Sequence, residues 1–209
     1  VALAARVTLL GLDHDRDDDR GDRHVAPIRL ATGQYVTPTA IDDAVQQYLN
    51  PGLAAYPNFI AGEAVRSQLS PDGSTLAVIT AGQNSLYKPD GTVDTANSTQ
   101  FIFLYDVQGA NRRAPRLKQV IQQVNAHVGL VFSPDGNTLY ATGGADDVVY
   151  AYVKGGSGWT LAAQIPLGHT NKGVGVNVRP NAAGLGISAD GRTLVVANNY
   201  NDSISVIDT

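Results

Sequence analysis

The stretch "SPDGNTLYATGGADDVVYAYV", residues 133–153, decides the fold because the chain repeats it. A close copy, "SADGRTLVVANNYNDSISVID", occupies residues 188–208, and a fainter one begins with "SPDGSTLAVITAG" at residues 70–82. The serines that open the three copies lie 63 and 55 residues apart. Internal repeats of this length with strand patterning inside them predict a propeller or a solenoid.

Each copy has the pattern of antiparallel strands joined by turns. In the second copy "LVF" (130–132) predicts an inner strand, and the following Asp-Gly pair predicts a hairpin turn. "NTLYATG" and "DVVYAYV" predict the second and third strands, and "GWTLAAQIPL" (158–167) predicts the fourth. Repeated four-stranded units are propeller blades, so we expect an all-β, β-propeller fold with about three blades. The expected blades cover residues 63–126, 127–181 and 182–209, and the last is incomplete because it ends before its fourth strand.

The first copy carries an insertion. "GQNSLYKPDGTVDTANST" (82–99) separates its second strand from "QFIFLYDV", the third, and "RLKQVIQQV" serves as the fourth. Insertions in loops leave the core intact and often carry function.

The segments before the blades are irregular. Residues 1–27 form a tail and an acidic linker, and residues 28–62 form an irregular segment in which "TAIDDAVQQYL" (39–49) predicts a short helix. Counted from Asp13 or Asp15 as the first ligand, the Asp-rich run "LDHDRDDDRGDRH" (12–24) has no glycine at the sixth position and no late glutamate, both of which an EF-hand loop needs. Its mixed charges favour a solvated linker, and an ion bound there is the alternative.

Composition narrows the functional classes. The chain of 209 residues is 43% hydrophobic, carries a net charge of −4 and has no cysteine. The acidic balance argues against nucleic acid as a partner, and the absence of cysteine excludes disulfides, thiolate zinc sites and c-type haem. We expect no membrane span, because no apolar run reaches about 18 residues. The opening "VALAARVTLLGL" is similar to the end of a signal sequence, which predicts export to the periplasm or the exterior.

A family resemblance is carried by "RTLVVANNYNDSISVIDT", residues 192–209, which resembles the YVTN-type β-propeller repeat. The wider context includes "ATGQYVTPTA", "LNPGLAAYPNFIAGEAV" and "GHTNKGVGVNVRPNAAGLGIS". Over about residues 28–209 it resembles the propeller half of exported bacterial proteins that also carry an alkaline-phosphatase-like phosphoesterase domain. The resemblance implies a ring that usually has seven blades, and the phosphoesterase domain has no counterpart in this sequence.

A ring of three blades cannot close, because propellers need about four to eight blades around their channel. We therefore expect the remaining blades, or a partner chain, to complete the ring. The same resemblance implies a phosphoesterase domain as a further partner.

The candidate ligand-binding residues are those that the repeats place near the channel mouth. His127 stands six residues before Ser133, at the start of an inner strand, and His169 lies in the Gly-rich "GHTNKGVGVNVRP". Lys and Arg offer charged donors to an anionic ligand, and glycine lets a ligand approach the backbone. The alternative is that these are ordinary polar connections whose donors satisfy buried carbonyls. The full set of candidates is Arg66, His127, His169, Lys172, Asn177 and Arg179.

No catalytic residue is predicted. The repeated serines stand at turns rather than in a G-x-S-x-G elbow, and "GHTNKG" lacks the ending of a P-loop. No cofactor is expected, although the turns at Asp146-Asp147 and Asn201-Asp202 offer oxygens that suit Ca²⁺. Asx residues in such turns usually bond to their own backbone instead.

Three functions remain open. The first is a non-catalytic binding or scaffold module of an exported protein, with any phosphoesterase activity in a domain absent here. The second is an enzymatic propeller, such as a lactonase-like hydrolase, with its site at the channel mouth. The third is a structural or adhesion protein of the cell surface.

Overall fold

The computed structural model describes residues 28–29, 31, 33, 35–36, 46–169 and 181–209. The chain divides into two compact units, residues 1–40 and 41–209. In the first unit the short strands β1 (Ile28–Arg29) and β2 (Tyr35–Val36) pair antiparallel.

Several expectations fall outside the described residues. These include the apolar start, the acidic linker and most of the helix expected over residues 39–49, of which the described residues 46–49 are not helical. Within the described residues, no helix has the length and apolar character needed to cross a membrane.

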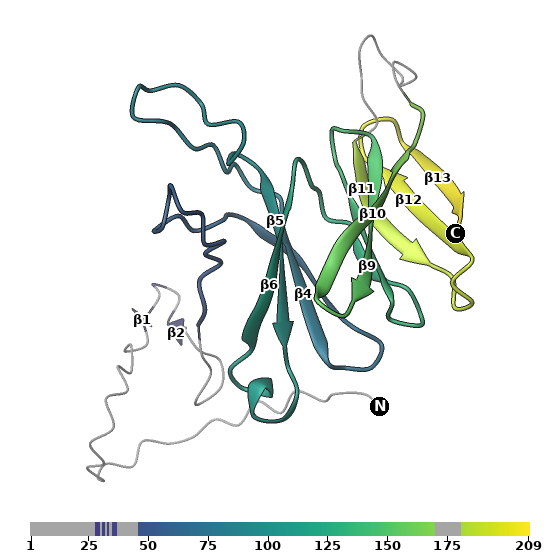
Figure 1. The fold of residues 1–209 in the computed structure, drawn as a ribbon, viewed down its shortest axis with the longest axis horizontal. Helices are drawn as coiled ribbons and strands as arrows, with labels where there is room; N and C mark the ends of the chain where they lie inside the picture. The colour runs from purple at the N-terminus through teal and green to yellow at the C-terminus, as the bar shows by residue number, and fades with distance from the viewer. Residues whose placement is uncertain (1–27, 30, 32, 34, 37–45, 170–180) are drawn as a thin grey trace. The chain divides into compact units, whose positions relative to one another are not determined.

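The second unit contains three antiparallel sheets, which we call blades 1, 2 and 3 (Figure 1). Blade 1 is β3 (Ala64–Leu69), β4 (Thr75–Thr80), β5 (Gln100–Asp106) and β6 (Arg116–Gln123), with the 3-10 helix η1 (Gly109–Arg112) between the last two. Blade 2 is β7 (Leu130–Phe132), β8 (Thr138–Thr142), β9 (Val148–Gly155) and β10 (Gly158–Pro166). Blade 3 has three strands, β11 (Ala182–Ile187), β12 (Thr193–Asn198) and β13 (Ser203–Asp208). The strands pair in chain order, which confirms the predicted all-β partial propeller.

The turn that opens each repeat is built in the same way three times. In blade 2 the Ser133 hydroxyl donates to Asp135 Oδ1 at 2.5 Å, and the same carboxylate oxygen accepts the Asn137 N–H at 3.0 Å. The Thr138 N–H donates to Ser133 Oγ at 2.9 Å, and Gly136 takes a φ of 71°, which favours glycine. Because the Ser133 N–H also bonds to the Thr138 carbonyl, this turn sets the register of β7 against β8.

Alternation along the strands of blade 2 places one of its faces against blade 1 and the other against blade 3. Leu139 and Ala141 of β8 join a core with Ile79, Ile102 and Leu104 of blade 1. The residues between them point to the opposite side of the sheet, where they pack on blade 3. That second core contains Tyr140, Val149, Ala151, Leu194 and Val196.

The free face of blade 1 is covered by the irregular segment that precedes it. Leu49, Leu53 and Phe59 pack against Phe101 and Phe103 of β5, whose side chains are almost wholly buried. Residues 46–62 therefore occupy the position that a preceding blade has in blades 2 and 3.

Replacing Ser133 with alanine should lower the free energy of unfolding by about 1–3 kcal/mol, because a buried hydroxyl that bonds on two sides is lost. Urea unfolding followed by circular dichroism measures the change. Ser157→Ala removes an exposed hydroxyl and should change stability by less than about 0.5 kcal/mol. Equal losses in the two variants would contradict the structural role of the turn.

The turn aspartates should make stability fall in acid. The hydrogen bond from Ser70, assisted by the Ser74 amide and hydroxyl, lowers the pKa of Asp72 from 3.8 to about 2, and the pKa values of Asp135 and Asp190 are also lowered. A carboxyl with a lowered folded pKa contributes stability above its unfolded pKa of 3.8, and loses that contribution as pH falls through about 2. Urea unfolding from pH 5 to pH 2 should therefore show a decline that is smaller in Asp72→Asn. An unchanged pH dependence in that variant would contradict the assignment.

Candidate functional site at the blade connections

Two adjacent carboxylates, Asp146 and Asp147 in the β8–β9 turn, hold the two connections of blade 2. Asp146 accepts a hydrogen bond from Asn125 Nδ2 at 2.7 Å, in the connection from blade 1, and one from the Tyr150 hydroxyl at 3.1 Å. Burial, with Asp146 acting in the same direction, raises the pKa of Tyr150 to about 12, so the phenol keeps its proton at neutral pH.

Asp147 reaches in the other direction, to the connection into blade 3. Its Oδ2 accepts the His169 N–H at 2.8 Å, and its Oδ1 lies 3.0 Å from His169 Nδ1. The other ring nitrogen, Nε2, lies 3.2 Å from the Ser205 hydroxyl on β13. The result is an Asp147–His169–Ser205 chain between blades 2 and 3, with Asp147 held at a left-handed φ of 56°.

The sequence did not predict this chain, because Ser205 lies on a strand, whereas the serines that recur in the repeat stand at its turns. All four carboxylate oxygens of Asp146 and Asp147 have a polar contact, and a Ca²⁺ at this turn stays a prediction. Among the described residues, no group of three or more His, Asp or Glu side chains is arranged to hold a metal.

Gln123 forms a separate polar link at the interface between blades 1 and 2. Its amide donates to the carbonyls of Asn125 and Thr142, at 2.6 and 3.1 Å, and accepts the Tyr152 hydroxyl at 2.9 Å. Gln123 is therefore a junction of blades 1 and 2.

The sequence-predicted ligand residues are only partly described. Lys172, Asn177 and Arg179 lie outside the described residues. Arg66 is exposed on β3, whereas His127 lies half-buried between β6 and β7 with its buried Nδ1 lacking a hydrogen-bond partner in the described chain. Among described residues, no hydrogen bond or ion pair joins Arg66, His127 and His169, so their shared anion site stays a prediction.

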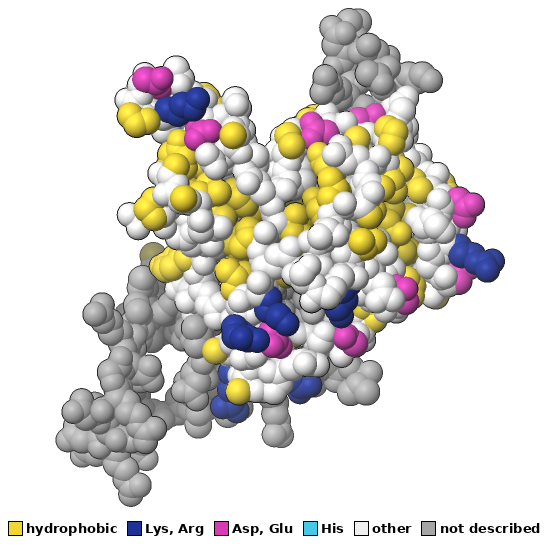
Figure 2. Space-filling view, viewed as in Figure 1, with side chains coloured by type: hydrophobic (Ala, Val, Ile, Leu, Met, Phe, Trp, Pro, Cys, Tyr) yellow, Lys and Arg dark blue, Asp and Glu magenta, His cyan; other side chains and the backbone are white. Residues whose placement is uncertain are grey.

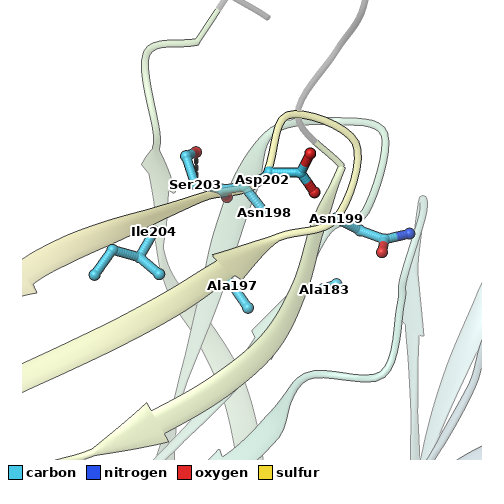
Figure 3. A pocket seen from close by; sticks show the side chains of 7 residues that line it. All are labelled: Ala183, Ala197, Asn198, Asn199, Asp202, Ser203 and Ile204. Carbon is cyan, nitrogen blue, oxygen red and sulfur yellow. Dashed lines mark hydrogen bonds between the residues drawn. The ribbon is translucent and has the colours of Figure 1, made fainter. Parts of the chain in front are cut away.

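A hollow of about 570 Å³ lies on blade 3 (Figure 3). Its lining comes from all three strands and the β12–β13 turn: Ala183, Ala197, Asn198, Asn199, Asp202, Ser203 and Ile204. Asn198 donates to the Ser203 and Ser205 hydroxyls, and its buried Oδ1 has no partner in the described part of the chain.

The insertion of blade 1 is an ordered arm. Tyr87 and Val93 form a bridge within it, and Asp94 accepts hydrogen bonds from Tyr56 and Asn97 at 3.0 and 2.8 Å. The arm is thus tied to the segment before blade 1.

Comparison with solved structures gives a likeness to several chains at low identity. A protein of Lactobacillus plantarum is 17% identical with a TM-score of 0.52, over 88% of this chain and 46% of that one. A β-propeller domain of Myceliophteria thermophila is 13% identical with a TM-score of 0.49, over 72% of this chain and 39% of that one. A Bacteroides fragilis protein, provisionally described as a 6-phosphogluconolactonase, is 12% identical with a TM-score of 0.43, over 87% of this chain and 59% of that one.

The chain thus spans between about two fifths and three fifths of the length of these proteins. No protein-family model and no curated protein matches the sequence. The three antiparallel sheets and their repeated turns define the chain as a segment of a β-propeller.

The Asp147–His169 contact should make the effects of substitutions at these two residues on the unfolding free energy non-additive. Asp147→Gly keeps the left-handed backbone and removes only the carboxylate, and His169→Ala removes the ring. In a double-mutant cycle we expect a coupling of about 0.5–3 kcal/mol, measured by urea unfolding.

The equivalent residue of blade 3, Asp202, provides a matched control. It also has a left-handed φ, 51°, but its exposed carboxylate makes no hydrogen bond within the described part of the chain. Asp202→Gly should therefore be neutral and should not couple to His169→Ala. A coupling of zero for Asp147 would show that the contact contributes nothing.

Proposed function

We propose that the chain is a non-catalytic binding and scaffold segment of an exported bacterial β-propeller, whose ring further blades complete. One observation carries the proposal. The outer face of blade 3 has apolar residues at the same positions as the equivalent faces of blades 1 and 2, but those two faces are buried and this one is exposed.

Strand register identifies the equivalent positions. Ile102, Val149 and Ile204 each stand on the third strand of a blade, opposite the ninth residue after the repeat serine. The first two are fully buried by the next blade, whereas Ile204 is 66% exposed. Two residues further along, Leu104 and its equivalent in blade 2 are also buried, whereas Val206 is 64% exposed. Exposed large apolar side chains that adjoin one another mark an interaction surface.

Backbone packing also differs between the buried face of blade 2 and the exposed face of blade 3. A Cβ on Gly129 would lie 2.4 Å from the Ala183 carbonyl, which also accepts the Thr142 hydroxyl at 2.9 Å, because the inner strand of blade 3 passes there. The equivalent of Gly129 in blade 3 is Gly184, where, among the described residues, a Cβ would meet only Ala197, at 3.6 Å. The hollow of Figure 3 lies where the next inner strand would pack.

The free edge of β13 also supports a further blade as the partner of blade 3. Among the described strands β13 pairs only with β12, whereas its equivalents β5 and β9 each pair with a fourth strand. An apolar face beside an exposed edge is normally covered in a native protein. We therefore propose a further β-blade as the occupant, with a strand that pairs with β13.

The wider context rests on sequence resemblance. The signal-like start supports export, and the similarity to propeller–phosphoesterase proteins supports a phosphoesterase domain in the complete protein. In this proposal the propeller positions ligands or partners for that domain and needs no cofactor of its own.

Charge substitutions on blade 3 test the ring. Ile204→Lys should change the unfolding free energy of the 209-residue chain by less than about 0.5 kcal/mol, because the site is exposed there. In the native, full-length polypeptide it should cost about 3 kcal/mol or more, because an unpaired charge would be buried. Tyr200→Lys, at a turn where the residue is 63% exposed, is the control. A cost that is equally small in both proteins would contradict the proposal.

The Asp147–His169–Ser205 chain favours a hydrolase as the second candidate. A carboxylate, an imidazole and a hydroxyl in this order can generate a nucleophile. Ser205 is, however, also bonded to Asn198 at 2.9 Å, which suits a structural tie between blades.

Lactone hydrolysis measured on the intact ring separates these roles. A hydrolase should lose at least about a hundredfold in turnover on Ser205→Ala, with Ser203→Ala as the control. Turnover that is absent, or unchanged in Ser205→Ala, would remove the hydrolase.

A further inference from the structure

A second cavity, of about 510 Å³, lies between blade 1 and the β9–β10 hairpin of blade 2. Its apolar part is formed by Leu104 and Trp159, which are both buried. Lys118 on β6 and Lys154 on β9 line the same cavity from different blades. The Gly-rich tip of the hairpin, residues 155–158, closes one side. We call this cavity the lysine cleft.

The walls of the lysine cleft are held together by a two-point hydrogen bond. Gln119 Nε2 donates to the Trp159 carbonyl at 2.7 Å, and the Trp159 N–H donates to Gln119 Oε1 at 2.8 Å. Gly158 has a φ of 127°, which favours glycine, and a Cβ there would lie 2.6 Å from Gln119 Oε1, so the Gln119 side chain would have to shift. The Trp159 ring also packs edge-on against Phe132, with ring centroids 5.6 Å apart. The cleft is therefore rigid before any ligand enters, which lowers the entropic cost of binding.

Positively charged residues are concentrated in the stretch that supplies Lys118 and at Lys154, although the whole chain is acidic. Residues 46–169 and 181–209 contain eight Lys and Arg, and five of them lie at positions 112–118 or at 154. On the face of the molecule that Figure 2 shows, most of the Lys and Arg side chains lie in the lower part of the view.

The two lysines of the cleft are available to a ligand. In the described chain neither Lys118 nor Lys154 forms an ion pair, whereas the neighbouring Arg116 is paired with Asp106 at 3.4 Å. Lys154 acts on Asp72, and Lys118 on Asp106, only at longer range.

We propose that the lysine cleft binds a phosphate-type oxyanion, free or carried as the ester of a small apolar group. Two ammonium groups supply charge-assisted hydrogen bonds to its oxygens. The exposed glycines of the hairpin tip allow close approach to the backbone, and the Ser157 hydroxyl has no other partner in the described chain. Leu104 and Trp159, almost wholly buried, form the apolar floor of the cleft beneath an ester group. The cleft lies wholly within blades 1 and 2, so its binding does not depend on completion of the ring.

Trp159 is the single tryptophan of the chain, so its fluorescence reports directly on the cleft. The 209-residue chain is titrated with phenyl phosphate, inorganic phosphate and phenol, in parallel with calorimetry. We expect saturable binding of phenyl phosphate that weakens as salt is added, and none of phenol. Weaker binding of inorganic phosphate assigns the site to an ester, and equal binding assigns it to the free anion.

Charge-removing variants locate the site. Lys118→Gln and Lys154→Gln should each weaken phenyl phosphate binding about tenfold, the loss of one charge-assisted hydrogen bond. Lys88→Gln removes the same charge from the inserted arm and should leave the affinity unchanged. All variants should keep the unfolding free energy of the parent chain, since these lysines are exposed.

Two results would overturn the proposal. The first is a phenyl phosphate titration that stays linear to about 10 mM, well above a millimolar dissociation constant. The second is a loss of affinity in Lys88→Gln as large as in the cleft variants, which would show only non-specific attraction. Neither result bears on the ring, which the Ile204 variants test separately.

Discussion

The hydroxyl–carboxylate–amide turn is the interaction on which the other features depend. In all three blades a serine hydroxyl donates to an aspartate 2.5–2.6 Å away, and a threonine N–H returns to the serine oxygen at 2.9–3.0 Å. This closes the first hairpin in one register. Because side chains alternate with a period of two, a slip by one residue would reverse the faces of the following strand. The turn thus decides which residues meet which neighbouring blade.

This register lets successive blades stack face to face along the chain. Blades 2 and 3 each bury one face against the blade before them, and each blade presents its other face to the next position, so stability is a sum of terms between neighbours. Asp146 and Asp147 add a polar tie to this stacking, one toward blade 1 and one toward blade 3. The segment at residues 46–62 caps the first face, whereas the last face remains exposed. The architecture is directional, and its open end is on blade 3.

The same stacking creates the places where ligands can bind. Most polar groups at the blade connections are used in holding blades together, as His169 and Gln123 are. The lysine cleft differs, because Lys118 and Lys154 face a cavity and have no ion-pair partner in the described chain. An apolar core cannot bind an oxyanion, but a groove at the outer edge of two blades keeps its ammonium groups hydrated until a ligand replaces the water.

The sequence by itself determined the all-β class and nearly every strand, because alternation and Asp-Gly turns are local properties of the chain. It also indicated that His127 and His169 stand at blade connections. The predicted anion site that they would share with Arg66 stays a prediction, because no described contact joins the three residues. Only the tertiary structure decided the partners: His169 meets Asp147, 22 residues earlier, and Ser205, 36 residues later. Likewise Lys118 and Lys154 converge from different blades. Such pairings depend on how sheets pack face to face, and the period of a strand specifies which face a residue occupies but not what lies opposite.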